Sequence, residues 1–179
     1  MSSYGAKELA NSFRTVRKNT VQVAADIPES QYDFVAAPGT RSVAEQLKHI
    51  LYAPTLFEDV HKEKKLKTLQ GYDFPGFMTR ANAAEKVKRT KAEVVAALAT
   101  EGERFAAWIE KLKPEFLAET YTDSMGQNPK TRFENLHSAK EHEMHHRAQL
   151  MLIERILGIT PHLTRQTEER MKARAAAAK

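Results

Sequence analysis

The stretch TRFENLHSAKEHEMHHRAQLMLIERIL, from Thr131 to Leu157, predicts a long helix and contains four of the seven histidines of the chain. Its centre reads His142-Glu143-Met144-His145-His146. Residues four apart lie on one face of an α-helix, so His142 and His146 can direct both imidazoles at one point. Pairs with this spacing are common metal ligands. The alternative interpretation is a pair of exposed histidines on a charged helix.

The other histidines of this helix lie on different faces. At roughly 100° per residue, His145 is about 60° to the other side of His142, and His137 is further round. Gln149 falls within about 40° of His142, one turn beyond His146. We expect Gln149 either to hydrogen-bond a group at the site or to be a polar residue packed at the end of the helix.

A third histidine, His49, lies in the segment AEQLKHILYA, whose apolar residues predict a buried helix. A single histidine in such a helix can be a core residue with internal hydrogen bonds. Together with His142 and His146, however, it would give three nitrogen ligands from two helices. That is the arrangement of a catalytic metal site with one open position.

Four amphipathic helices are predicted, over residues 9–27, 42–61, 79–112 and 131–157. The second begins with the capping box Ser42-x-x-Glu45, and Pro54 is expected to kink or restart it. The loops between them, 29–41, 66–77 and 115–130, contain Pro and Gly. Either 66–77 or 115–130 is expected to contribute to the pocket over the site. No segment alternates with period two, so the sequence predicts an all-α four-helix bundle.

The domain limits follow from composition. Residues 1–164 are predicted to form one domain, and the basic, alanine-rich tail 165–179 offers little to bury, so it is expected to be frayed or disordered. No apolar run has the length of a membrane span, and the start lacks the apolar core of a signal peptide. These features predict a cytoplasmic protein.

Charge and cysteine content narrow the chemistry. The chain has no cysteine, which excludes disulfides and thiolate ligands, so any metal must be held by nitrogen and oxygen. The net charge of +5 is scattered over several runs, which is more typical of a solvated surface than of a nucleic-acid groove. Nucleic acid is therefore not expected as a partner, and a small-molecule ligand is possible.

These motifs resemble a known family. EHEMHHRAQL, followed by LGI and Pro161, resembles the H-x-x-x-H-R-[GA]-Q signature of the DinB/YfiT-like superfamily of metal-binding four-helix bundles. SVAEQLKHI resembles the second helix of that family, which carries a single ligand histidine. The resemblance covers about Tyr4 to Thr164. It implies that His49, His142 and His146 are metal ligands in a bundle of the DinB/YfiT type.

The resemblance also implies a function. Family members include metal-dependent hydrolases and thiol-dependent transferases or isomerases that use glutathione, mycothiol or bacillithiol. The cofactor would be one divalent ion, Zn, Ni, Fe or Mn, with a possible low-molecular-weight thiol cosubstrate. The alternative is a non-catalytic metal-binding or stress-response protein, so whether the chain is an enzyme stays open, and a homodimer is possible.

Four charged residues near the histidines have candidate roles. Glu45, Glu141 and Glu143 could each accept a proton from the far nitrogen of a ligand histidine, although a solvated face is the default for all three. Arg147 points away from the histidine pair. It is expected to meet an acidic residue on a neighbouring helix or subunit.

Overall fold

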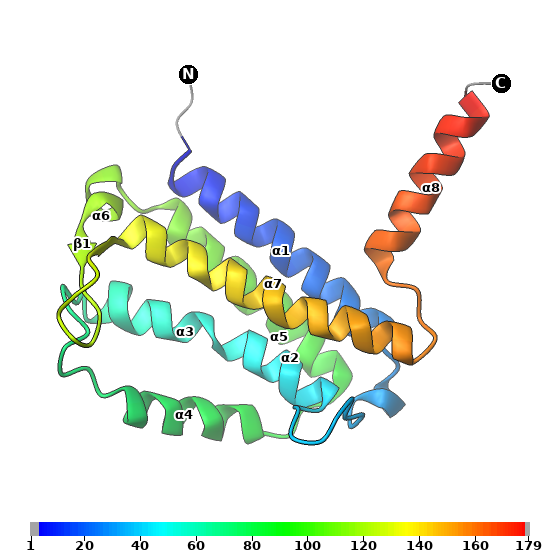
Figure 1. Ribbon diagram of the computed structural model, residues 1–179, viewed down its shortest axis with the longest axis horizontal. Coiled ribbons are helices and arrows are strands. Elements are labelled where there is room, and N and C mark those ends of the chain that lie inside the picture. Colours follow the sequence, from blue (N-terminus) through cyan, green and yellow to red (C-terminus); the bar gives the residue numbers. More distant parts are fainter. Residues whose placement is uncertain (1–3, 178–179) are drawn as a thin grey trace.

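The computed structural model describes residues 4–177, and this part of the chain is mostly helical. Three long helices, α1 (Ala6–Asp26), α5 (Lys91–Glu110) and α7 (Arg132–Ile156), lie side by side with a fourth helical unit (Figure 1). That unit consists of α2 (Val43–Tyr52), α3 (Pro54–Phe57) and the π-helical segment η2 (Glu58–Glu63). The all-α four-helix bundle predicted from the sequence is confirmed.

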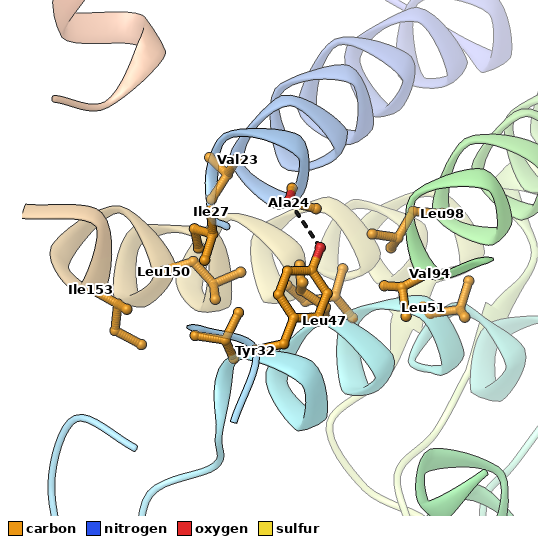
Figure 2. Close-up of a cluster of buried hydrophobic side chains, with 12 residues drawn as sticks. Val23, Ala24, Ile27, Tyr32, Leu47, Leu51, Val94, Leu98, Leu150 and Ile153 are labelled. Carbon is orange, nitrogen blue, oxygen red and sulfur yellow. Dashed lines mark hydrogen bonds between the residues drawn. The ribbon is translucent and has the colours of Figure 1, made fainter. Parts of the chain in front are cut away.

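The bundle is held together by apolar side chains that all four units direct inward. Figure 2 shows the cluster at one end, where the side chains of Tyr32 and of residues from α1, α2, α5 and α7 meet. The Tyr32 hydroxyl donates a hydrogen bond of 2.9 Å to the carbonyl oxygen of Ala24. A second cluster around Phe13, Phe105 and Leu136 fills the other end. The site described below lies between α2 and α7, which pack together in the first of these clusters.

The start of α2 and its interruption follow the sequence signals. The Ser42 Oγ accepts a hydrogen bond from the backbone N–H of Glu45, and the Glu45 carboxylate accepts one from the backbone N–H of Ser42. Two otherwise unpaired donors at the helix start are thereby satisfied. Pro54 begins α3 directly after α2, because proline suits the first turn of a helix and cannot continue the preceding hydrogen-bond ladder.

The prediction of a single helix over residues 79–112 is wrong, since the structure has two helices there. The first, α4 (Phe74–Lys86), starts within the predicted loop 66–77, and α5 begins only at Lys91. Thr90 and Glu93 form a capping box that starts α5, and the half-exposed Val87 stands in extended backbone between the two helices. The separate helix α4 runs beside α2, on the side away from α1 (Figure 1).

Short elements fill the remaining connections. These are the 3₁₀ turn η1 (Glu29–Gln31), α6 (Pro114–Ala118), and the two-residue strands β1 (Thr120–Tyr121) and β2 (Lys130–Thr131). The strands pair antiparallel, with Thr120 opposite Thr131 and Tyr121 opposite Lys130. This hairpin occupies the predicted loop 115–130 and closes the end of the bundle where α7 begins.

The tail from residue 165, which was expected to be frayed or disordered, is helical as far as Ala177. It belongs to α8 (His162–Ala177), which stands away from the bundle (Figure 1). Alanine, arginine, lysine and glutamate have high helix propensity, which favours this conformation without packing. The last two residues lie outside the described part of the chain, and the domain boundary at 164 stays a prediction. Among residues 4–177, every helix is too short or too polar to cross a membrane.

Near the end of α7, Glu154 is fully buried, and neither of its carboxylate oxygens has a hydrogen-bond partner among residues 4–177. Burial raises its pKa from 4.5 to about 7, and the nearby Asp26 acts in the same direction against Arg165 and Arg155. Between these two pH values the folded state keeps a proton that the unfolded chain has released. The stability contributed by this group is therefore fully present below about pH 4.5 and is lost as the pH rises to about 7.

Glu154→Gln is expected to remove this pH dependence, because glutamine stays neutral. Relative to the variant, the free energy of unfolding of the wild-type protein should fall by roughly 2–3 kcal/mol between acidic and mildly alkaline pH. Urea denaturation at about pH 5 and pH 8 measures the difference. Glu168→Gln, on the exposed face of α8, removes the same charge as a control. The prediction would be contradicted if the free energies of unfolding of the wild-type protein and Glu154→Gln differed by the same amount at both pH values.

Candidate metal centre

The imidazoles of His49 on α2 and of His142 and His146 on α7 meet between the two helices. Each offers a nitrogen, and these three atoms lie within 4.8 Å of one another. The His142 Nε2 is 3.1 Å from the Nε2 of His49 and 3.1 Å from the Nε2 of His146. Two nitrogens at about 2.1 Å from one ion would be roughly 3.0–3.4 Å apart at octahedral or tetrahedral angles. The spacing therefore fits a shared metal ion.

The ring nitrogens of His142 and His146 are in the form that a metal requires. Burial lowers the pKa of His142 from 6.5 to about 4, with further contributions from His146 and His49. Burial also lowers the pKa of His146. Both rings are consequently neutral at pH 7, with a lone pair available on a nitrogen.

Glu85 on α4 supplies the carboxylate that contacts His49. Its Oε1 lies 2.7 Å from the Nδ1 of His49, and both side chains are largely buried. Because an ionised carboxylate can only accept, the contact places the ring proton on Nδ1 and leaves the Nε2 lone pair facing the other two histidines. Glu85 thus fixes the tautomer of His49 in the orientation that a metal ligand needs.

The acidic residues expected near the histidines have other partners. Glu45 is engaged in the capping box of α2, and Glu143 forms a buried ion pair with Arg17 at 2.9 Å. Glu141 is exposed. Glu85 was missed because it is 36 residues from His49 and stands on a helix that the sequence analysis merged with α5. No local spacing signals this contact.

Two glutamines surround the far side of His146. The Oε1 of Gln149 is 3.1 Å from the Nδ1 of His146, and the Nε2 of Gln46 is 2.5 Å from that same Oε1. The Gln46 Nε2 also lies 2.5 Å from the His146 Nδ1. Gln149 therefore stands where an outer hydrogen-bond partner of a ligand would be. Gln46 was not predicted, although it precedes His49 by three residues on the same face of α2.

The remaining residues named from the sequence lie outside the centre. His137 packs against Tyr4 and Phe133, and the His145 Nε2 contacts Gln149 at 3.2 Å. Arg147 donates a hydrogen bond of 3.2 Å to the carbonyl oxygen of Val16. The expected acidic partner of Arg147 is thus replaced by a backbone carbonyl of α1.

Two cavities border the three histidines. A wide cavity of about 1010 Å³ reaches His146 and Gln149. The larger part of its lining is apolar, and its charged lining residues are Arg41, Glu45, Lys48, Glu85 and Lys86. A smaller cavity of about 290 Å³ reaches His49 and His142 and is mostly apolar. The predicted loop 66–77 contributes Phe74 and Phe77 to the smaller cavity, although both belong to α4. Residues 115–130 contribute to neither cavity.

Comparison with known proteins identifies the family. The family model described as the DinB superfamily matches residues 12–150. The chain belongs to the DinB superfamily. The matched range contains His49, His142 and His146, and the resemblance inferred from the sequence motifs is confirmed.

Two Bacillus subtilis proteins are similar to this DinB chain. The uncharacterised protein YjoA is 27% identical over 157 residues, which cover 87% of this chain and 92% of YjoA. The crystal structure of YjoA, described as a DinB-like protein, matches with a TM-score of 0.64 and 26% identity over 86% of this chain and 93% of that one. The YfiT structure has a TM-score of 0.67 at 15% identity, over 89% and 91% of the two chains. YfiT is described as "a probable metal-dependent hydrolase with an unusual four-helix bundle topology".

Proposed function

We propose that this DinB protein is a metal-dependent enzyme that binds one divalent ion through His49, His142 and His146. The observation that carries the proposal is the convergence of three imidazole nitrogens from two helices. Three further features support it, namely the Glu85 contact on the Nδ1 of His49, the neutral state of His142 and the description of YfiT. In this proposal Gln149 holds His146 in place through the Nδ1.

The donor set limits the ion and the chemistry. Three neutral imidazoles suit Zn, Ni, Fe or Mn and leave the charge of the ion undiminished. When bound with an open position, such an ion supplies a Lewis acid that polarises a carbonyl or acidifies a bound water or thiol. The protein has no cysteine, so any thiol must come from a small cosubstrate. The proposed reaction class is therefore hydrolysis or a thiol-dependent transfer or isomerisation.

Location and assembly belong to the same proposal. We place the protein in the cytoplasm, where low-molecular-weight thiols would be available to it. Met144, Leu152 and Ile156 on α7 are 42%, 60% and 54% exposed. A second copy in a homodimer would cover these side chains. Leu152 and Ile156 also line the wide cavity, so the partner copy would border the site. Sedimentation velocity on the purified chain measures the oligomeric state.

Elemental analysis of protein purified without a histidine tag tests the metal site. We expect about one divalent ion per chain, removable by a chelator and restored on reconstitution. The metal-loaded protein is then assayed with glutathione, mycothiol and bacillithiol against a panel of electrophiles, and with ester and amide substrates. Absence of stoichiometric metal contradicts the proposal. Stoichiometric metal without any turnover favours a non-catalytic metal-binding protein.

Glu85→Ala is expected to weaken metal binding roughly 10- to 100-fold, because loss of an outer carboxylate frees the orientation and tautomer of the ligand histidine. Glu85→Gln keeps an acceptor oxygen without the charge and should be intermediate. Competition with a chromophoric chelator measures the affinities. Glu141→Ala, an exposed acid beside His142, is the matched control. Equal weakening in Glu141→Ala would show that general charge, and not the contact with His49, causes the effect.

A further inference from the structure

The smaller cavity beside the histidines is lined largely by one face of α4. Phe74, Phe77, Met78 and Ala81 follow the spacing of successive helical turns, and all four border the cavity. Leu56 and Phe57 of α3 lie opposite. Phe74 is 49% exposed and its ring packs against that of Phe77. The face of α4 that is turned toward the site therefore presents apolar surface that the protein itself covers only in part.

The polar groups of this cavity leave no free charge in it. The Glu85 carboxylate is paired with the Nδ1 of His49. Apart from Glu85 and the two histidines, the polar side chains that line this cavity in the described part of the chain are the hydroxyls of Tyr52 and Ser138. The cationic side chains of Arg41, Lys48 and Lys86 line the wide cavity instead. Arg89 donates a hydrogen bond to the hydroxyl of Tyr52 and is not a lining residue of the smaller cavity. A charged group entering the smaller cavity would lose water without gaining an ionic partner from the protein.

The two cavities also reach different members of the histidine cluster. His49 and His142 border the smaller one, His146 borders the wide one, and Glu85 borders both. A molecule centred on the histidines can thus extend in two directions, toward a cavity with an almost wholly apolar lining and toward one whose lining also includes charged side chains. This division is typical of binding sites in which an apolar group sets the fit and a few polar groups set the orientation.

We propose that the cavity under α4 is the subsite for a neutral apolar group of the substrate, an aromatic ring system or a short branched alkyl chain. The assignment rests on the proposed function, since it places this group next to the metal-binding histidines. A cavity of about 150 Å³ with an apolar lining can hold benzene. At about 290 Å³, the cavity under α4 has room for two fused rings. The charged or hydrated part of the substrate then occupies the wide cavity.

Binding of 2-naphthol, which is neutral at pH 7 and has two fused rings, tests the subsite. Calorimetric titration of the metal-loaded protein is expected to show one molecule bound per chain. Ala81→Phe fills the cavity and should weaken binding at least tenfold. Ala83→Phe, two residues away on the exposed face of α4, adds the same ring outside the cavity and should stay within twofold of the wild-type protein.

The outcomes separate the subsite from the metal site, because metal content is measured on every sample. The subsite proposal is wrong if Ala81→Phe binds 2-naphthol as tightly as Ala83→Phe does. It is also wrong if the metal-loaded wild-type protein binds no 2-naphthol. If the protein contains no stoichiometric metal, the proposed function is wrong. If such a protein still binds 2-naphthol and Ala81→Phe abolishes that binding, the cavity is nevertheless a ligand site. Ala81→Leu, a smaller filling substitution, provides the same comparison if Ala81→Phe does not fold by circular dichroism.

Discussion

Substitution of His142 by alanine is expected to lower the affinity for a divalent ion by at least about 100-fold, more than the loss of an outer hydrogen bond causes. The Nε2 of His142 lies 3.1 Å from the corresponding atoms of His49 and His146. The rings of His49 and His146 also approach each other, with centroids 4.7 Å apart, so the three imidazoles form a triangle. Removing the His142 imidazole leaves two protein ligands instead of three.

Elemental analysis of the purified variant, followed by competition with a chelator, measures this loss. His137→Ala is the matched control, because His137 is on the same helix but outside the cluster, packed against Tyr4 and Phe133. The control is expected to keep about one ion per chain. Equal metal content in His142→Ala and the wild-type protein would contradict the assignment of the ligands. Circular dichroism establishes that both variants keep their helices.

Replacing Glu143 by alanine is expected to destabilise the fold by about 3–5 kcal/mol, because it leaves the charge of Arg17 buried without its partner. The Arg17 and Glu143 side chains are 4% and 2% exposed, and the guanidinium binds both carboxylate oxygens. A further guanidinium nitrogen donates to the carbonyl oxygen of Leu98. Arg17 therefore joins α1 to α5 and α7 behind the histidine cluster.

Urea denaturation of the metal-free protein measures the destabilisation separately from any effect of the ion. Glu141→Ala removes an exposed acid two residues away and should change the free energy of unfolding by less than about 0.5 kcal/mol. The double substitution Arg17→Met with Glu143→Leu replaces the whole pair by apolar groups, and it is expected to recover most of the loss. A Glu143→Ala protein as stable as Glu141→Ala would show that the pair does not hold the helices together.

The close approach of Arg17 to α5 also explains Gly102. A Cβ at this position would lie 2.4 Å from the Cγ of Arg17. Glycine in the interior of a helix lowers its stability, yet Gly102 is buried within α5. In the structure it is the point where a buried arginine from α1 needs space, so the absence of a side chain serves the packing of two helices.

Local signals in the sequence were sufficient for the bundle and for the pairing of His142 with His146. Their spacing of four residues puts them on one helix face, whatever the helix packs against. In the same way the capping box at Ser42 and the restart at Pro54 depend only on neighbouring backbone groups. Such features involve residues within one or two turns of each other, and the geometry of the α-helix determines them.

Tertiary packing decided the surroundings of the histidines. Glu45 and Glu143 were reasonable partners by spacing, yet one is used at a helix start and the other by Arg17. The break between α4 and α5 places Glu85 beside His49 and turns Phe77 and Met78 toward the site. The sequence by itself therefore determined the helices and the histidine pair, since these follow from local periodicity. Only the tertiary structure decided which carboxylate and which cavities meet the histidines, because these contacts join helices that are far apart in the chain.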